Sequence, residues 1–342
     1  MKVLVVPDVH GSLCWKRIKN IPKESYDYAV FLGDYVDSWE NRWSEQGDNI
    51  KEIFDWIRED TEHRKCLIGN HDFSYISSSR DGNKVSGHQY DKALEIRKIF
   101  EDNYDVVDLA AEFDGWVFSH AGFTKTWVAS LLHHLHQELD KWPDEFYERH
   151  MFQTKEESDD FLKRMGDGLL VWDENEFSID FLNGYWHKRS HNPGGKNTRL
   201  AFDELLDWNG YFSGSGDEIT QGPLWVRPHS LLKDAYYPKQ VVGHTEMCFG
   251  EPVGLSFRNK KVVVVDSTEH DLIYIFDTEN PCGFITEAEH NKLDKRMYQT
   301  LNVLLSTKIR DEDVIKNELL AKGAKETQLK AYINLLKSYW KD

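Results

Sequence analysis

Six side chains that can bind metal ions occur at intervals along the chain, each close to the end of a short apolar run. They are Asp8, His10, Asp34, Asn70, His120 and His244. Carboxylate, amide and imidazole groups together suit divalent first-row metals such as manganese, iron or zinc. If the loop after residue 6 stays extended, alternation places Asp8 and His10 on the same side of it. The sequence therefore predicts a metal centre assembled from segments far apart in the chain.

A simpler explanation exists for any one of these residues taken alone. An Asp or Asn after a strand often caps the helix that comes next. Helix capping does not explain why such residues follow one strand after another. They are also accompanied by His71 and Asp72, and by nearby glycines that let the backbone turn sharply. We therefore favour the metal site over a set of unrelated caps.

The elements that must position these residues are short strands. Apolar runs rich in β-branched residues occur at 2–6, 28–32, 66–68, 116–119 and 240–242. Each is typical of a buried strand that ends in a loop. Helix-like stretches lie between them, such as 49–60, where the apolar residues fall on one face. Strands alternating with helices predict an α/β layered fold, in which ligand sites gather at the carboxyl ends of the strands.

Two regions depart from this alternation. Residues 124 to about 224 are rich in Trp, His and acidic residues and have little strand character, so we expect a largely helical insertion. The chain from about 308 is typical of a small helical tail. Between them, strands are expected at 253–257, 261–266 and 272–276, spaced like an antiparallel meander. Asp266, at the end of the second of these runs, is expected to orient a ligand.

The polar residues fall into five ordered motifs. These are DVHG (8–11), GDYVD (33–37), GNHD (69–72), HAG (120–122) and GHT (243–245). Together they resemble the signature of the calcineurin-like metallophosphoesterases. The last motif is most similar to the bacterial and phage phosphoprotein phosphatase branch, which includes diadenosine tetraphosphatases, since many other members have GHxH there. The resemblance implies a four-layer β-sandwich flanked by helices over residues 1–300, with the insertion at about 124–224, and then an appendage at 301–342.

The resemblance also implies roles for the matching residues. Asp8, His10 and Asp34 would hold one metal ion, and Asp34 would bridge to a second held by Asn70, His120 and His244. A hydroxide shared by the two ions would attack phosphorus in line. His71 would protonate the leaving oxygen, and Asp37 would hold the His71 imidazole.

The residues expected to bind phosphate depart from the family pattern. Many members have an arginine directly after the position of Asp37, but this chain has Ser38 there. Arg42 lies four positions later, and Arg227 belongs to an LWxR stretch similar to one that supplies a phosphate-binding arginine in bacterial members. We expect phosphate to be bound by Arg227, with Arg42 and Asn70 as further candidates. The alternative for Arg227 is a surface ion pair.

These residues predict a dinuclear metal-dependent phosphatase that acts on phosphomonoesters, including phosphoserine or phosphothreonine in proteins. The expected cofactors are two divalent ions, manganese first, with iron, zinc or nickel as alternatives. The open alternatives are a nucleotide or dinucleoside polyphosphate hydrolase, a nucleic-acid end-processing enzyme, and a binding module that keeps the fold without turnover.

The amino-acid composition limits the expected binding partners and cellular location of the protein. With 42 basic and 59 acidic residues the net charge is −17, which repels a nucleic-acid backbone over most of the surface. The tail from 308 to 342 is the exception, with eight basic and six acidic residues, and it gives weak support for a nucleic-acid partner. No apolar run approaches the roughly 20 residues of a membrane helix. We expect a cytoplasmic protein with a phosphorylated protein or nucleotide as its partner.

Overall fold

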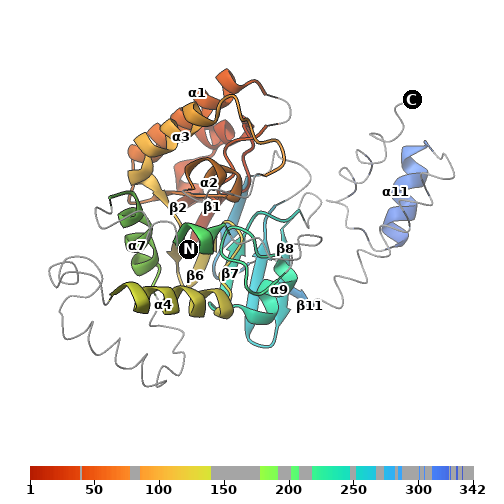
Figure 1. The fold of residues 1–342 in the computed structure, drawn as a ribbon. Coiled ribbons are helices and arrows are strands. Elements are labelled where there is room, and N and C mark those ends of the chain that lie inside the picture. Colours follow the sequence, from red (N-terminus) through yellow and green to blue (C-terminus); the bar gives the residue numbers. More distant parts are fainter. Residues whose placement is uncertain are drawn as a thin grey trace.

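Two mixed β-sheets lie face to face and carry helices on their outer faces (Figure 1). The structure is a computed structural model that describes residues 1–38, 41–77, 85–139, 178–191, 202–207, 218–246, 252–266, 273–281, 284–286 and 310–322, with single residues at 300, 304, 324, 329 and 333. Its strands are β1 (Lys2–Val6), β2 (Tyr28–Phe31), β3 (Arg64–Leu67), β4 (Val107–Asp108), β5 (Ala110–Phe113), β6 (Trp116–Ser119), β7 (Lys239–Val242), β8 (Val253–Phe257), β9 (Lys260–Val264), β10 (Tyr274–Asp277) and β11 (Phe284–Thr286). Its α-helices are α1 (Trp43–Arg58), α2 (Asn70–Ile76), α3 (Ala93–Asp102), α4 (Lys125–Leu139), α7 (Ile179–His191), α9 (Pro228–Asp234) and α11 (Glu312–Ala321), and short 3-10 helices cover Cys14–Asn20, Lys23–Ser25 and Tyr104–Val106.

The strand order brings several strand ends to the same place. The first sheet has the order β10-β1-β2-β3-β4, and the second has the order β11-β8-β9-β7-β6-β5. Strands β1 to β4 are parallel to one another. In the second sheet β6, β7 and β9 are parallel. Because parallel neighbours end at the same edge of a sheet, the loops after these strands can build one site.

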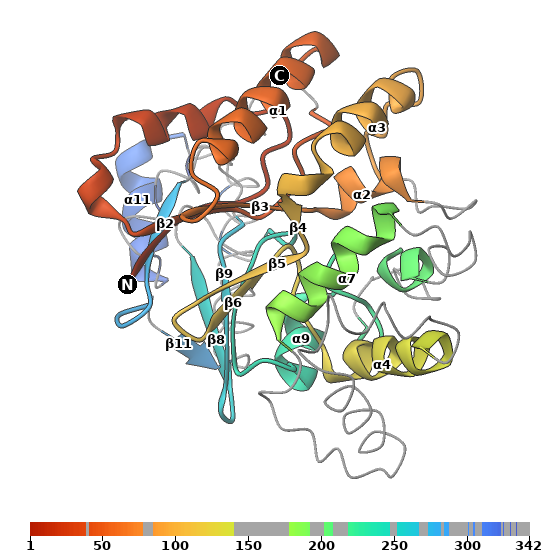
Figure 2. The same ribbon diagram turned by 90° about the vertical axis from the view of Figure 1, so that its left-hand side faces the viewer.

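Side chains that alternate along β1 fill two different cores. Val3 and Val5 belong to the apolar cluster between the two sheets, whereas Leu4 and Val6 belong to the cluster beneath the helices. Helices α1 and α3 cover the first sheet and α9 packs on β8 and β9 of the second (Figure 2). The order helix, sheet, sheet, helix is the four-layer α/β sandwich that the family resemblance implied.

All eight strands expected from the sequence are present, with bounds that differ by one or two residues. Three further strands, β4, β5 and β11, were not expected. Strand β4 has two residues, β11 has three, and β5 reads AAEF, so none of them carries a strong strand pattern. These strands exist because their neighbours in the sheets pair with them.

The predicted antiparallel meander is wrong in its third strand. Strands β8 and β9 pair antiparallel as expected, but β10 pairs antiparallel with β1 at the edge of the other sheet. The apolar face of β10 explains this choice. Phe276 is fully buried between the sheets, where its ring makes edge contacts with Trp116 at 4.9 Å and Phe118 at 5.7 Å between centroids.

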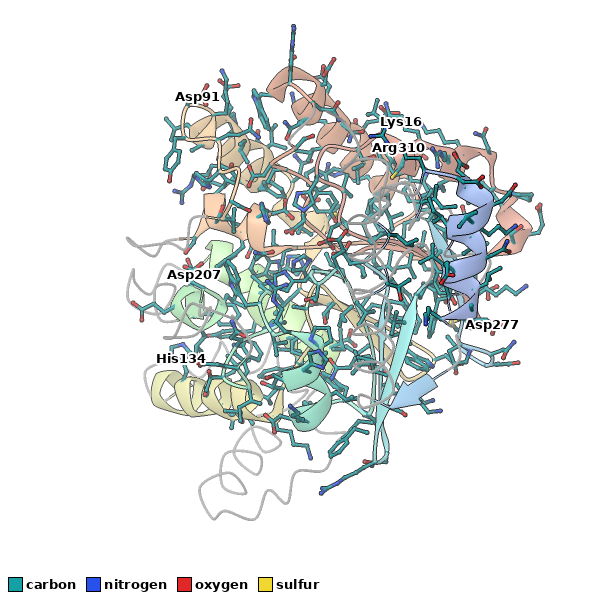
Figure 3. The ribbon with its side chains drawn as sticks, turned by 90° about the vertical axis from the view of Figure 1, so that its right-hand side faces the viewer. Lys16, Asp91, His134, Asp207, Asp277 and Arg310 are labelled. Carbon is teal, nitrogen blue, oxygen red and sulfur yellow. The ribbon has the colours of Figure 1, made fainter. Side chains whose placement is uncertain are left out.

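Helix α1 begins six residues before the predicted start at 49. Its first turn is closed by the Glu45 carboxylate, which accepts the backbone N–H of Arg42 at 3.2 Å. The predicted apolar face, which includes Ile50, is buried against the first sheet. The outer surface of this layer carries charged side chains, such as the exposed Asp91 and the partly exposed Lys16, which pairs with Glu52 (Figure 3).

Regular structure in the described parts of 125–224 is helical, as expected: α4, α7 and residues 202–206. Helix α7 is part of the main core, since Trp186 is fully buried and donates its indole N–H to the carbonyl of Val107 at 2.6 Å. In the tail, α11 is preceded by Asp311, whose carboxylate caps the helix by accepting two backbone N–H groups. No described helix is long and apolar enough to span a bilayer.

Candidate metal centre

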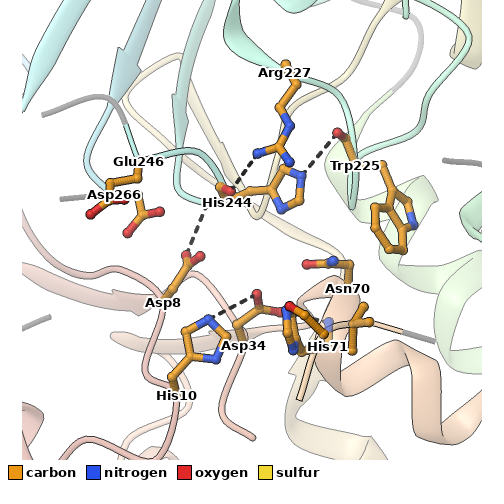
Figure 4. Close-up of a pocket in the computed structure, with 12 residues that line it drawn as sticks. Asp8, His10, Asp34, Asn70, His71, Trp225, Arg227, His244, Glu246 and Asp266 are labelled. Atoms are coloured by element: carbon orange, nitrogen blue, oxygen red, sulfur yellow. Dashed lines mark hydrogen bonds and ion pairs between the residues drawn. The ribbon is translucent and has the colours of Figure 1, made fainter. Parts of the chain in front are cut away.

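The six candidate ligands converge where parallel strands end. Asp8 and His10 come after β1, Asp34 after β2, Asn70 after β3, and His120 and His244 after β6 and β7. His10 and His244 are partly exposed and the other four are buried. Figure 4 shows the groups from the first sheet facing His244 of the second sheet across a pocket. The fold therefore brings together segments that lie far apart in the sequence.

Left-handed backbone conformations are concentrated at this site. His10, Asp34, Asp37 and His244 have φ angles of 41°, 51°, 63° and 61°. Non-glycine residues rarely adopt such angles, and those that do are found most often where function requires a particular side-chain direction. His10, Asp34 and His244 line the pocket, and Asp37 contacts His71, which also lines it.

Two glycines let the backbone approach the carboxylates closely. A Cβ on Gly69 would lie 2.1 Å from Oδ1 of Asp34, and a Cβ on Gly243 would lie 2.4 Å from Oδ1 of Asp8. Both distances are far below any allowed contact, so only glycine fits. The glycines next to the motif residues thus have a packing reason that concerns the site itself.

The first group of ligand atoms comes from His10, Asp34 and His71, which lie within 4.8 Å of one another. Nε2 of His10 is 3.7 Å from Oδ2 of Asp34. Nδ1 of His10 is 2.9 Å from the carbonyl of Val36, which can only accept, so the ring proton lies on Nδ1. Nε2 therefore presents a lone pair, as a metal ligand must.

The second group comes from Asp34, His120 and His244, again within 4.8 Å of one another. Nδ1 of His120 donates to the carbonyl of Leu32 at 2.9 Å, and Nε2 of His244 donates to the carbonyl of Trp225 at 3.1 Å. Both inner nitrogens, Nε2 of His120 and Nδ1 of His244, are therefore left as acceptors, and they lie 3.2 Å apart.

Two oxygen atoms complete this second group. Nε2 of His120 lies 2.8 Å from Oδ1 of Asn70 and 3.5 Å from Oδ2 of Asp34. Burial lowers the pKa of His120 to about 3 and holds that of His244 well below its usual value, so both rings stay neutral. The inner nitrogens of His120 and His244 thus converge with two oxygen atoms and carry no proton between them. A divalent cation is the partner that such a donor set fits.

Asp8 and Asp34 share this space. Oδ1 of Asp8 accepts the backbone N–H of His244 at 3.1 Å and lies 3.9 Å from Nδ1 of His120. Burial, together with the nearby charges of Asp8 and Asp72, raises the pKa of Asp34 well above its usual value. A bound cation would reverse this effect, because positive charge favours the ionised carboxylate.

His71 and Asp37 form a second feature beside the ligands. Nδ1 of His71 is 2.9 Å from Oδ2 of Asp37, which is fully buried. The backbone N–H of His71 donates to Oδ1 of Asp34 at 2.9 Å, so the first turn of α2 is tied to the ligand group. With Nδ1 engaged by a carboxylate, Nε2 of His71 is the nitrogen left for the pocket that this residue lines.

The pocket between the sheets has a volume of about 340 Å³. Its lining residues are Asp8, His10, Asp34, Asn70, His71, Val85, Ser86, Trp225, Arg227, His244, Glu246 and Asp266. Arg227 donates to the carbonyl of His244 at 3.2 Å (Figure 4). It also donates to the hydroxyl of Thr245 at 3.1 Å. The pocket therefore combines the candidate ligands, one arginine and the His71 side chain.

Comparison with known proteins decides the family. Residues 1–214 match the sequence profile of the calcineurin-like phosphoesterases, which is more than half of the chain. This chain belongs to that family. Among curated protein sequences none matches.

Solved structures with a similar fold include two phosphatases. The cold-active protein-tyrosine phosphatase of a psychrophilic Shewanella species is 16% identical, and the match covers 81% of this chain and 75% of that one with a TM-score of 0.47. A protein serine/threonine phosphatase from Saccharomyces cerevisiae is also 16% identical, over 78% of this chain and 67% of that one, with a TM-score of 0.37.

Arg42 is the candidate that the phosphoesterase fold does not bring into the pocket. It is exposed at the start of α1 and is not among the lining residues. The side chain of Asp72, by contrast, lies under the site, where its two oxygens accept the backbone N–H groups of Tyr35 at 2.8 Å and Gly69 at 3.0 Å. Asp72 thus holds together the two loops that carry Asp34 and Asn70.

Sequence reasoning missed four residues around the phosphoesterase site. Val85, Ser86 and Glu246 line the pocket, and Tyr75 donates its hydroxyl to Asp37. Val85 and Ser86 stand in a segment with no pattern of apolar or polar residues. Tyr75 could have been found, because it lies one helical turn after His71 and so shares its face of α2.

Proposed function

We propose that this calcineurin-like phosphoesterase is a dinuclear metal-dependent phosphatase of the phosphoprotein phosphatase type, which hydrolyses phosphomonoesters. The observation that carries the proposal is the convergence of unprotonated donors: Nε2 of His120 and Nδ1 of His244 are 3.2 Å apart, with Asp34 shared between two ligand groups. A shared carboxylate between two sets of imidazoles is the arrangement that a pair of cations requires.

Asp8, His10 and Asp34 would hold one ion, and Asp34, Asn70, His120 and His244 the other. His10 and Asp34 lie with His71 in the first ligand group, and Asp34 lies with His120 and His244 in the second. When bound, two divalent ions supply the activated water and the positive charge that phosphoryl transfer needs. Manganese is the first candidate, and iron, zinc or nickel would suit the same mixture of oxygen and imidazole donors.

The remaining steps belong to side chains of this chain. Arg227 would bind phosphate oxygens, for which its planar guanidinium is suited. His71 would donate the proton from Nε2 to the leaving oxygen. The leaving group would then depart as an alcohol, because an unprotonated alkoxide is a poor leaving group. Asp37 would stabilise the protonated imidazole through the 2.9 Å contact with Nδ1.

The charges in the pocket favour a single phosphate over a chain of phosphates. Among the described lining residues Arg227 is the only one with a permanent positive charge, whereas Glu246 and Asp266 add two carboxylates beyond the ligands. Figure 4 shows both carboxylates on the side of the pocket that is near Asp8. A dinucleoside polyphosphate would place further negative charge against this wall. Phosphoserine or phosphothreonine in a protein is therefore our first substrate class, and nucleotides are the second.

The experiment is turnover of p-nitrophenyl phosphate and bis-p-nitrophenyl phosphate by metal-stripped protein, with and without added manganese. Manganese-dependent turnover of the monoester is the expected result. Turnover of the diester alone would replace the phosphatase by a phosphodiesterase or nucleic-acid enzyme, which salt-sensitive binding to oligonucleotides would support. No turnover of either substrate with two metal ions bound would favour a binding module.

A further inference from the structure

Tyr75 is a buried side chain whose hydroxyl points at the His71–Asp37 pair. It lies in α2 four residues after His71, and only 5% of it is exposed. Its hydroxyl donates to Oδ1 of Asp37, the oxygen that His71 does not use. Each oxygen of the fully buried Asp37 carboxylate thus has its own donor.

The direction of this hydrogen bond is fixed by a third group. The backbone N–H of Gln89 donates to the Tyr75 hydroxyl oxygen at 2.7 Å. That oxygen accepts a hydrogen bond from Gln89, and a carboxylate can only accept, so the Tyr75 hydroxyl donates its proton to the hydrogen bond with Asp37. Burial, and then the hydrogen bond to Asp37, raises the pKa of Tyr75 above its usual value, so the hydroxyl keeps its proton at neutral pH.

The ring of Tyr75 is also held in place by its neighbours. It stacks on His88 with centroids 4.1 Å apart and planes 9° apart. Nδ1 of His88 is 3.1 Å from the hydroxyl of Ser74, which donates to the carbonyl of His71 at 2.7 Å. The segment that holds Tyr75 through His88 and Gln89 begins with Val85 and Ser86, which line the pocket. The pocket wall and the support of His71 are therefore one unit.

We propose that Tyr75 is a positioning residue for proton donation: its hydroxyl fixes the Asp37 carboxylate, which in turn fixes the His71 imidazole with Nε2 toward the leaving group. The proposal rests on the phosphatase function proposed above. A carboxylate held at one oxygen can rotate about its Cβ–Cγ bond, whereas one held at both oxygens cannot. Asp37 also has a φ angle of 63°, so its backbone turn already depends on the surrounding contacts.

A purely structural role makes a different prediction. If Tyr75 only pairs a buried carboxylate oxygen, Tyr75→Phe lowers the melting temperature, because it leaves a charged acceptor unsatisfied, and slows all substrates alike. If Tyr75 acts through His71, the loss falls on substrates that need a proton. The leaving group therefore separates the two roles where stability cannot.

The test compares glycerol 2-phosphate, which has a poor alkoxide leaving group, with p-nitrophenyl phosphate. We expect Tyr75→Phe to lower kcat by about tenfold on the first and by less than about twofold on the second, as a part of the 10²–10⁴ that general acids contribute. The matched control is Tyr104→Phe, which removes a buried hydroxyl that donates to the carbonyl of Trp186 at 2.9 Å. The control should lower the melting temperature and leave both rates unchanged.

Two further readouts keep the test decisive. In a His71→Asn background, Tyr75→Phe should cost no additional rate, because the residue through which it acts is gone. In ¹⁵N-labelled protein, the chemical shift of the His71 Nδ1–H group should change in Tyr75→Phe and remain unchanged in Tyr104→Phe. This result does not depend on whether the wild type turns over either substrate. Absence of wild-type turnover would contradict the proposed function, and an unmoved resonance would contradict the positioning role.

If Tyr75→Phe fails to fold, His88→Ala replaces it. This variant keeps the Tyr75 hydroxyl and its two hydrogen bonds, and removes the stacked ring together with its contact to the Ser74 hydroxyl. A smaller loss, again confined to glycerol 2-phosphate, is expected. Equal losses on both substrates, or no loss on either, would overturn the proposal.

Discussion

Nε2 of His120 lies 3.2 Å from Nδ1 of His244, although each ring places its proton on its other nitrogen. Two facing lone pairs repel, and burial prevents a proton from joining them, since the pKa of His120 falls to about 3. The fold holds them in this position through the carbonyls of Leu32 and Trp225. The metal-free site is thus organised for a positive charge that the protein itself does not supply.

Metal addition should therefore stabilise the protein strongly. We expect manganese at about one hundred times its dissociation constant to raise the free energy of unfolding by about 2.7 kcal/mol per site, measured by chemical unfolding with chelator and with metal. His244→Ala should remove most of the stabilisation from one site. His63→Ala is the control, because His63 is an exposed residue paired with Asp60 far from the pocket. Equal stabilisation of both variants would contradict the ligand assignment.

Substituting Gly69 should weaken metal binding, beyond the loss of stability that backbone strain alone would cause. Gly69→Ala would place a methyl group 2.1 Å from Oδ1 of Asp34 and 2.3 Å from its backbone nitrogen, so the loop that carries Asp34 must move. We expect at least about a tenfold loss of metal affinity, or about 1.4 kcal/mol. Gly115→Ala is the matched control, since Gly115 has a φ angle of 71° with nothing within 4 Å of the added carbon.

The control variant should cost stability through backbone strain alone, about 1 kcal/mol, and leave metal affinity unchanged. Isothermal titration with manganese measures both affinities. If Gly69→Ala binds metal as tightly as the wild type, the close approach of the two loops has no bearing on the site.

The strand ends, and the polar residues that meet there, could be predicted from the sequence because both depend on local pattern. A run such as Lys2–Val6 with buried apolar residues, and then Asp8, specifies both a strand and the polar loop after it. The partner of a strand is not local. Strand β10 has the pattern of a meander strand, but Phe276 fills the space between the sheets, and only the edge beside β1 brings it there.

Tertiary packing also decides which of the candidate phosphate-binding residues reaches the pocket. Arg42 and Arg227 are both arginines near a motif, and their sequence positions do not tell which side chain reaches the pocket. Helix α1 starts at Trp43 and carries Arg42 outward, whereas Arg227 precedes α9 and is tied to the loop of His244. Direction at a helix start depends on tertiary packing.

Stability of the metal-free protein should fall as pH rises from about 6.5 to 8. Burial raises the pKa of Asp72 to about 8 and that of Asp34 well above its usual value, so the folded state holds protons that the unfolded chain has lost. Stability from these groups is present below their unfolded pKa and is lost as pH rises through the folded one. His120 and His244 act oppositely, but only below about 6.5, where an unfolded histidine is protonated.

The free energy of unfolding of the metal-free protein should fall by about 1.4 kcal/mol per pH unit for each proton that the folded state holds and the unfolded chain has lost. Manganese should flatten the decline, because a cation favours the ionised form of Asp34. Urea unfolding at four pH values between 6.5 and 8, with chelator and with manganese, measures both curves. A metal-free stability that stays level or rises over this range would show that these carboxyl groups are already ionised in the folded protein.

Arg227 and Arg42 can be separated by inhibition with inorganic phosphate, the product of the proposed reaction. Arg227 lines the pocket and its guanidinium is held beside His244, so Arg227→Ala should weaken phosphate inhibition by about tenfold or more, the loss of one charge-assisted hydrogen-bonding group. Arg42 is exposed outside the lining residues, so Arg42→Ala should change the inhibition constant by less than about twofold and serves as the matched control. The constants come from p-nitrophenyl phosphate turnover at several phosphate concentrations. If Arg42→Ala weakens inhibition as much as Arg227→Ala, both arginines bind phosphate, and the start of α1 must then approach the pocket when substrate is bound.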